Sequence, residues 1–243
     1  GFTPTYEQLY SETDPCVANA VVIFGGGCTG ITVSREGLIF TNHHCGYSSI
    51  QQLSSVEHDY LKDGFVSQNK NEELPVPGLS VQYLSEMIDV TERINPVIAP
   101  IEEEYKRLMA ADSVGQVLCD SVGMNEFKRA SVIPFYSDNK YYLVVYNVYR
   151  DVRLVFAPPS SVGKFGGDTD NWMWPRHTGD FSVFRVYANA NNEPASYSSE
   201  NQPYSPKYVA EVSLQGYDDK DYAMTIGFPG STSRYLCSWG VKQ

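Results

Sequence analysis

Short apolar runs alternate with polar positions along most of the chain, a pattern typical of β-strands. Residues 19–24 (Asn-Ala-Val-Val-Ile-Phe) predict a strand, and the three glycines that follow predict a bend. Residues 29–35 and 38–42 predict a hairpin that turns at residues 35–37. The same pattern predicts further strands at residues 79–84, 133–136, 141–149, 153–156, 181–187 and 222–228.

Three segments depart from the strand pattern. From Ile101 onward, apolar residues recur at helical spacing behind an acidic first turn, so we expect a helical insertion at approximately residues 100–130. Residues 48–64 are polar and acidic and predict a short helix and a loop. Residues 165–179 hold three glycines, two tryptophans and a proline. Long irregular loops of this kind more often carry function than serve as connectors.

Many short strands with Gly- and Pro-rich turns indicate a mainly β fold, a barrel with a helical insertion. The length of 243 residues and a hydrophobic content of 42% fit a globular chain with a substantial core. The net charge of −11 argues against a nucleic-acid partner, since such proteins present basic patches. No apolar run approaches the roughly 18 residues of a membrane span. Gly1 is not a natural start, which is compatible with a signal peptide removed ahead of it.

Two of the five cysteines, Cys28 and Cys45, lie at neighbouring predicted strand ends. This placement favours a disulfide between them and hence an oxidising compartment. Cys16, Cys119 and Cys237 have no evident partner in the sequence.

The segment Thr-Asn-His-His-Cys at residues 41–45 is the first candidate for chemistry. A histidine fixed at the rim of a barrel by a neighbouring disulfide suits the general base of a serine hydrolase, and His44 is the candidate. The alternative is a half-buried histidine with a structural hydrogen bond. A metal shared by His43 and His44 is disfavoured, because adjacent residues of an extended chain point to opposite faces.

The loop at residues 165–179 leads to the second candidate. A serine hydrolase needs a carboxylate that accepts from the base, and Asp180 is well placed at the start of a predicted strand. A turn aspartate is the alternative, and Asp168 and Asp170 compete for the role. Asn171 and Trp172 either bind a substrate terminus or pin the loop to the core.

No nucleophile motif accompanies this pair. A peptidase of this kind carries a Gly-x-Ser-Gly-like turn whose backbone N–H groups form an oxyanion hole, and the sequence has no such segment. Ser231 follows a predicted strand but is a poor candidate, because the nearby Pro229 removes a backbone donor.

These motifs resemble the bacterial dipeptidyl-peptidase 7 and 11 family of chymotrypsin-clan serine exopeptidases. In that resemblance the catalytic His falls on His44 and the catalytic Asp on Asp180. The family's Asn-Trp pair, which binds the free N-terminal amine of the substrate, falls on Asn171 and Trp172. The similarity covers nearly the whole chain and includes residues 73–75, 156–159 and 227–231.

The resemblance implies a partial chymotrypsin-like double β-barrel, with residues 1–243 as the N-terminal part of a longer enzyme. The helical domain and the serine would follow beyond residue 243. It also implies release of dipeptides from peptides with a free N-terminus, no cofactor or metal, a homodimer, and a periplasmic or secreted location. Residues 19–24 and 77–81 look closer to dipeptidyl-peptidase 11, which prefers acidic penultimate residues, than to dipeptidyl-peptidase 7, which prefers apolar ones.

Three rival interpretations remain at this point. The main one is a non-catalytic β-barrel that binds peptides. The others are a secreted structural protein and a metal hydrolase built on His43, His44 and His177.

Overall fold

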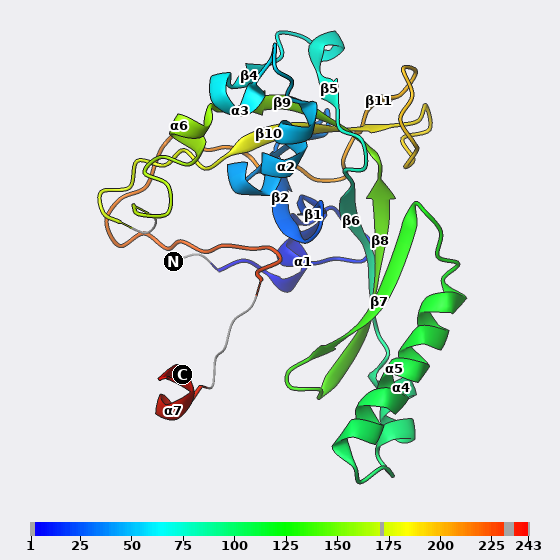
Figure 1. The fold of residues 1–243 in the computed structure, drawn as a ribbon. Helices are drawn as coiled ribbons and strands as arrows, with labels where there is room; N and C mark the ends of the chain where they lie inside the picture. The colour runs from blue at the N-terminus through cyan, green and yellow to red at the C-terminus, as the bar shows by residue number, and fades with distance from the viewer. Residues whose placement is uncertain (1–2, 171–172, 231–235, 243) are drawn as a thin grey trace.

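The computed structural model describes residues 3–170, 173–230 and 236–242 (Figure 1). Its strands are β1 (Val21–Phe24), β2 (Cys28–Thr32), β3 (Leu38–Thr41), β4 (Phe65–Val66), β5 (Leu74–Pro75), β6 (Val81–Asp89), β7 (Lys128–Phe135), β8 (Lys140–Tyr149), β9 (Asp151–Ala157), β10 (Ser182–Ala188) and β11 (Gln202–Pro203). Its α-helices are α1 (Tyr6–Leu9), α2 (His43–Leu53), α3 (Tyr60–Asp63), α4 (Thr91–Ile98), α5 (Glu104–Ser121), α6 (Ser160–Gly163) and α7 (Ser238–Val241). None of the described helices has the length and apolarity to cross a membrane.

One eleven-stranded antiparallel sheet organises the molecule. Nine strands follow the order β4-β9-β10-β3-β2-β1-β6-β8-β7, while β5 pairs with β9 and β11 with β10. The sheet closes into a barrel because β8 and β9, which lie next to its two end strands, are consecutive in the chain. β8 pairs with β6 and β9 pairs with β10, yet only Arg150 separates Tyr149 of β8 from Asp151 of β9. The pairing path from β9 round to β8 therefore returns to its start.

The barrel is filled by apolar side chains that the strands direct inward. They include Val22, Ile39, Val81, Leu154 and Phe184, all buried. Burial of these β-branched and aromatic groups is the main stabilising term for such a fold. The mainly β prediction is confirmed, since all the strands of the described residues belong to one sheet.

The helical insertion is present but shifted from its predicted limits of 100–130. α4 already begins at Thr91, and β7 occupies the sequence from Lys128. Pro96 lies inside α4, and a proline opposes a helix prediction because it lacks the N–H of the helical ladder. α4 and α5 pack on the far half of the β7–β8 hairpin, outside the barrel, around a second apolar cluster (Figure 1).

Residues 222–228 do not form the predicted strand. The alternating apolar residues Tyr222, Met224 and Ile226 are exposed, and no described strand pairs with the segment. Its end is fixed instead by a hydrogen bond from the Phe228 N–H to Thr29 Oγ1 at 2.7 Å. A strand needs a neighbour for its backbone groups, so alternation alone was an insufficient signal.

A buried ion pair fastens β5 to the outside of the barrel. Arg185 Nε donates to Glu73 Oε1 at 2.8 Å, and Tyr187 donates its hydroxyl to the other carboxylate oxygen at 2.7 Å. The Glu73 and Arg185 side chains are only 2% and 11% exposed. Water therefore screens this pair little, and Glu73 depends on Arg185 for compensation of its charge.

Replacing Arg185 by methionine is expected to lower the free energy of unfolding by about 3 kcal/mol, because it leaves the Glu73 carboxylate buried without a cation. The matched control is Lys70→Met, which breaks an exposed ion pair with Glu36 and is expected to cost less than about 1 kcal/mol. Urea unfolding measures both. Equal effects would show that the buried pair contributes no more than the exposed one.

Candidate active site

His44 lies in the first turn of a helix and not at the strand end where sequence reasoning placed it. β3 ends at Thr41 and α2 begins at His43. The buried residues of α2 are His43, Gly46 and Ile50, spaced so that they share one helical face. His44 consequently turns the other way, and its side chain is 70% exposed. The two histidines do point apart, but they diverge around a helix and not along an extended chain as expected.

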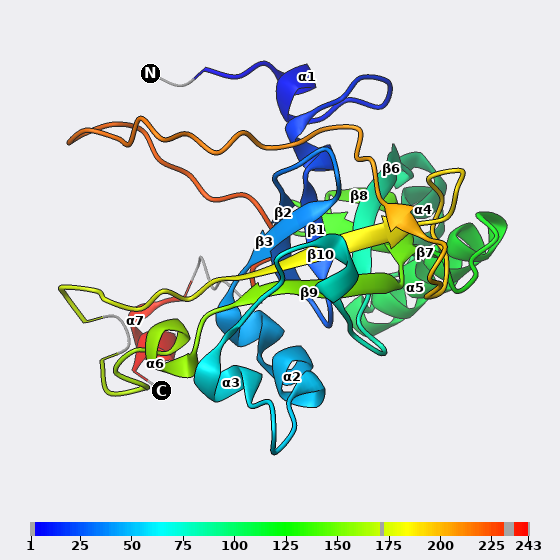
Figure 2. The ribbon, with the colours of Figure 1, turned by 90° about the horizontal axis from the view of Figure 1, so that it is seen from above.

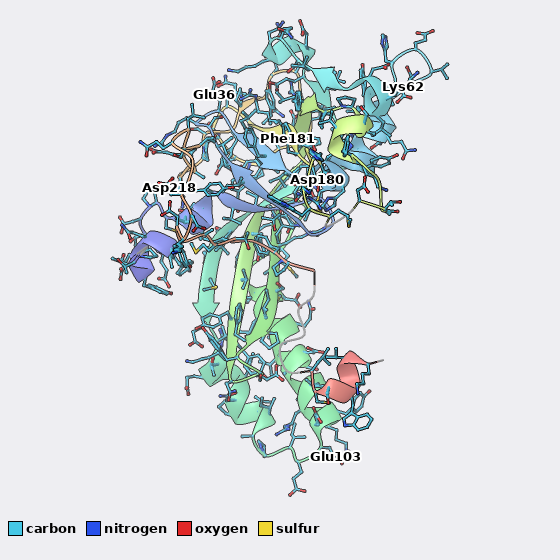
Figure 3. The ribbon with its side chains drawn as sticks, turned by 90° about the vertical axis from the view of Figure 1, so that its left-hand side faces the viewer. Glu36, Lys62, Glu103, Asp180, Phe181 and Asp218 are labelled. Carbon is cyan, nitrogen blue, oxygen red and sulfur yellow. A yellow bond between two sulfur atoms is a disulfide. The ribbon has the colours of Figure 1, made fainter. Side chains whose placement is uncertain are left out.

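Asp180 contacts His44 twice. One carboxylate oxygen, Oδ1, accepts the His44 backbone N–H at 3.0 Å, and the other, Oδ2, lies 2.7 Å from the ring Nδ1. Asn42 is the N-cap residue of α2, but its side chain makes no capping bond. Asp180 thus caps the helix from another part of the chain while it orients the imidazole. Figure 3 labels Asp180 in the barrel half of the molecule.

The electrostatics fix the state of this pair. Burial raises the pKa of the Asp180 carboxyl, but hydrogen bonds from His44 and Asn42 outweigh burial and hold the pKa below its ordinary value. Asp180 is therefore ionised at neutral pH and only accepts. The Nδ1 of a neutral His44 must carry the proton of their bond, which leaves Nε2 with a lone pair that can act as a base.

Three further contacts fix the turn that carries His44. Cys45 is joined by a disulfide to Cys28 of β2, 17 positions earlier in the chain. In the chain-entropy model, a disulfide that closes a loop of this length stabilises the folded state by about 3 kcal/mol. Ser182 Oγ donates to the carbonyl of Asn42 at 3.2 Å. A Cβ at Gly46 would lie 2.8 Å from that same Ser182 Oγ, so only glycine fits there without a shift. The other three cysteines, Cys16, Cys119 and Cys237, are free thiols.

A cavity of about 560 Å³ opens beside His44 and Asp180. Its walls come from the first turn of α2 and from the loop that joins α6 to β10, and they include Tyr47, Phe165, Asp168, Arg176 and Thr178. Figure 2 shows α2, α3 and α6 gathered at this side of the barrel. The lining of the cavity combines the aromatic rings of Tyr47 and Phe165 with the charged side chains of Asp168 and Arg176.

The loop at residues 165–179 contributes to the site, but among the contacts of the described residues neither of its competing carboxylates, Asp168 and Asp170, bonds to His44. Asp168 forms an exposed ion pair with Lys164, so Asp180 is the aspartate beside His44. The predicted substrate-binding residues Asn171 and Trp172 lie outside the described residues, as does Ser231. Within the described part of the chain, the His44 ring is hydrogen-bonded to Asp180 and to no hydroxyl.

Sequence reasoning missed Asn42, Ser182 and Gly46, which support the pair without taking part in it. An asparagine directly ahead of a helix is an N-cap signal, but the helix start itself was not predicted. No sequence signal identified Gly46 or Ser182, because their partners are distant in the chain.

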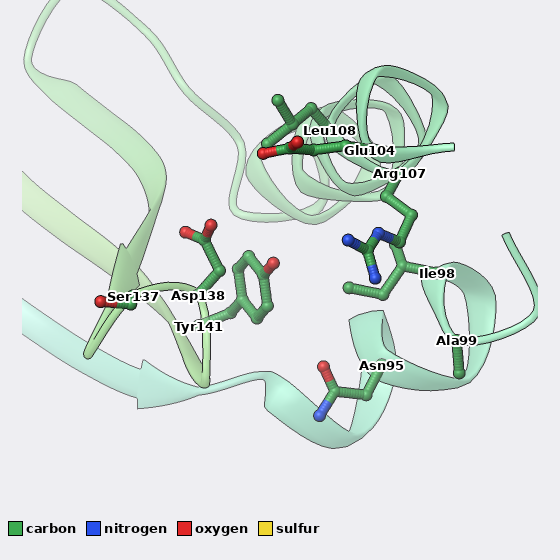
Figure 4. A pocket seen from close by; sticks show the side chains of 9 residues that line it. All are labelled: Asn95, Ile98, Ala99, Glu104, Arg107, Leu108, Ser137, Asp138 and Tyr141. Atoms are coloured by element: carbon green, nitrogen blue, oxygen red, sulfur yellow. The ribbon is translucent and has the colours of Figure 1, made fainter. Parts of the chain in front are cut away.

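A second hollow of about 410 Å³ lies between α4, α5 and the β7–β8 turn (Figure 4). Asn95, Glu104, Arg107, Asp138 and Tyr141 are among its lining residues. None of them was selected by the sequence analysis. Figure 3 shows Glu103, beside this hollow, at the opposite end of the molecule from Asp180.

His43 is the buried neighbour of the candidate base. Its side chain packs edge-on against Tyr47, and neither ring nitrogen has a hydrogen-bond partner within the described residues. Burial lowers the pKa of the His43 ring below its ordinary value, against the opposing charge of Asp180, and His44 adds to the lowering.

This shift predicts a pH dependence of stability. Below about pH 6.5 the unfolded chain takes up a proton at His43 that the folded state resists, so the unfolding free energy falls as pH falls from 7 to 5. The slope from one such group is at most about 1.4 kcal/mol per pH unit. Urea unfolding of wild type and His43→Phe at pH 7, 6 and 5 measures it. The variant should show a shallower slope, and identical slopes would contradict the assignment.

Known proteins of similar sequence share the whole of this chain. The sequence pattern of the Peptidase S46 family matches this chain over residues 1–243. Dipeptidyl-peptidase 7 of Porphyromonas gingivalis is 64% identical over all of this chain, which covers 34% of that protein. An Asp/Glu-specific dipeptidyl-peptidase of Porphyromonas endodontalis is 47% identical, with 97% of this chain and 34% of that protein covered.

Solved structures give the same result. The crystal structure of Porphyromonas endodontalis DPP11 in an alternate conformation matches with a TM-score of 0.81 at 46% identity, over 90% of this chain and 33% of that one. Its complex with substrate matches with a TM-score of 0.80 at 45% identity. These matches support the chymotrypsin-like, partial fold that the resemblance implied.

Identity over the whole chain reverses one expectation. Residues 19–24 and 77–81 pointed to dipeptidyl-peptidase 11, yet the dipeptidyl-peptidase 7 of P. gingivalis is the more similar, at 64% against 47% for the Asp/Glu-specific relative. Two short segments are a weaker measure than 242 aligned residues. The chain spans about a third of the length of these relatives. On the strength of the match along its full length, the chain belongs to the peptidase S46 family.

Proposed function

We propose that this chain supplies the base, His44, and the orienting acid, Asp180, of a serine dipeptidyl-peptidase. The observation that carries the proposal is the pair of hydrogen bonds between these residues, at 3.0 and 2.7 Å, in a member of a peptidase family. Relatives that share the whole chain are named dipeptidyl-peptidases, which favours exopeptidase chemistry for the full protein.

The position of the His44 ring suits the two proton transfers that a serine peptidase needs, one from the serine and one to the leaving amine. The free Nε2 of His44 would accept the proton of a serine hydroxyl as its oxygen attacks the scissile carbonyl. The resulting imidazolium would then give that proton to the leaving amine, which breaks the peptide bond and leaves an acyl-enzyme for water to hydrolyse. Asp180 favours the charged ring throughout, because its carboxylate lies 2.7 Å from Nδ1.

The loop that borders the cavity would set the cleavage position. Asn171 and Trp172 belong to this loop, and its described parts, including Phe165 and Arg176, line the cavity next to His44. A binding site there for the substrate's ammonium group would lie at a fixed distance from His44. Only the peptide bond two residues from the N-terminus would then reach the catalytic groups, so the product would be a dipeptide. The higher identity to dipeptidyl-peptidase 7 favours apolar penultimate residues over the acidic ones first expected.

The cellular location and the oligomeric state of the protein are part of the same proposal. The disulfide between Cys28 and Cys45 supports a periplasmic or secreted location, where disulfides persist. The family resemblance implies a homodimer, and size-exclusion chromatography with light scattering of the full-length protein tests that assembly.

In the full-length protein, His44→Ala is expected to lower kcat/KM for dipeptide release by at least about 10³-fold, because the base is lost. Asp180→Asn is expected to lower kcat by about 10⁴-fold through the wrong tautomer of His44. His58→Ala, at an exposed histidine stacked on Tyr60, is the matched control and should keep wild-type activity. Near-normal turnover by His44→Ala, with a normal melting temperature, would refute the proposal.

A serine-reactive fluorophosphonate probe separates the peptidase from the rival peptide-binding barrel. Full-length wild-type protein is expected to be labelled, because the probe needs an activated serine. His44→Ala should be labelled far more slowly, since its serine lacks a base. Peptide binding without any labelling of the wild type would favour the non-catalytic rival.

A further inference from the structure

The buried His43, whose ring nitrogens have no hydrogen-bond partner among the described residues, contacts the backbone of α6. It is 1% exposed. A Cβ built on Gly163 would lie 2.6 Å from both Cγ and Cδ2 of the His43 ring, and 2.9 Å from Nδ1. The backbone of Gly163 therefore rests directly against the imidazole, at a distance that only glycine permits.

Gly163 is the last residue of α6, and α6 in turn fixes the chain next to Asp180. The Gly179 N–H donates to the carbonyl of Val162 at 2.9 Å. A Cβ on Gly179 would lie 3.0 Å from Val162 Cγ1, so the approach is close on this side as well. The two ends of the loop between α6 and β10 thus meet where Val162 contacts Gly179. Val162 directly precedes Gly163, which contacts His43, and Gly179 directly precedes Asp180.

These contacts form a continuous path that starts and ends in the first turn of α2. His43 supports Gly163, Val162 holds Gly179, and the next residue, Asp180, binds His44. His43 and His44, the two ends of this path, are adjacent in α2. A displacement of α6 against His43 must therefore appear as a displacement of the Asp180 carboxylate against the base.

We propose that His43 is a positioning residue, whose ring supports α6 through Gly163 and so keeps Asp180 at hydrogen-bonding distance from His44. The role depends on the shape of the ring and not on a hydrogen bond, because both ring nitrogens are unpaired within the described residues. The inference rests on the proposed function, since its effect is on the base and acid of that reaction.

The test uses the full-length protein and a double-mutant cycle. Gly163→Ala places a methyl group against the ring and is expected to lower kcat for dipeptide release by about 100-fold, with KM changed less than about threefold. His43→Ala removes the support of α6 and is expected to lower kcat similarly. In the double variant the new methyl group enters the space that the ring leaves, so kcat should exceed that of Gly163→Ala alone.

Two variants separate positioning from simple core filling. His43→Phe keeps a planar ring at Gly163 and is expected to retain kcat within about threefold, even where His43→Ala loses it. Ser161→Ala changes an exposed residue of the same short helix and should match the wild type in kcat and melting temperature. The pH profile of kcat/KM should shift in Gly163→Ala, because Asp180 then stabilises the charged form of His44 less well.

A purely structural role gives different results. It predicts lower melting temperatures for His43→Ala and Gly163→Ala with unchanged kcat and an unchanged pH profile, and that outcome overturns the inference. Multiplicative effects in the double variant overturn it too, since they would show no coupling between the two positions. Absence of dipeptide release by the wild type would instead refute the proposed function itself.

Discussion

The two hydrogen bonds between His44 and Asp180 join residues 136 positions apart, and most of the fold is needed to make them. The antiparallel register of β3 and β10 is the direct cause, because it pairs Thr41 with Ser182. The residues just beyond the end of β3 and just before the start of β10 are therefore neighbours. That register in turn depends on the closed barrel, whose path runs from β9 through β10 and β3 to β8.

The site is rigid on the side of the base and more open on the side of the loop. A disulfide, a glycine contact and a serine hydrogen bond fix the first turn of α2. The loop from α6 to β10 is held at its two ends by Val162 and carries exposed charges between them, such as the ion pair of Lys164 with Asp168. This division suits a hydrolase that keeps its catalytic groups fixed while substrates differ.

Local sequence was enough to predict the disulfide between Cys28 and Cys45 and to single out His44 and Asp180 as candidates, because each stands near a predicted strand end with a recognisable residue pattern. It was not enough to predict that α2 begins at His43, since that helix is capped by a carboxylate from a distant segment. Residues 222–228 show the converse error, in which a correct strand pattern finds no described partner. The roles of Gly46 and Gly163 depend on close approaches in three dimensions, which a single sequence does not record.

Asp180 caps the helix with one carboxylate oxygen and binds the imidazole with the other, and this has an evolutionary consequence. With the role proposed for Asp180, selection for folding and selection for catalysis act on one side chain, so relaxation of the second does not release the first. A descendant that had lost the proposed activity would still gain stability from a carboxylate at this position, because a helix cap contributes about 1 kcal/mol. Retention of the aspartate in such a lineage would therefore be poor evidence of activity, whereas the exposed ring of His44 is free to drift once its chemistry is no longer used.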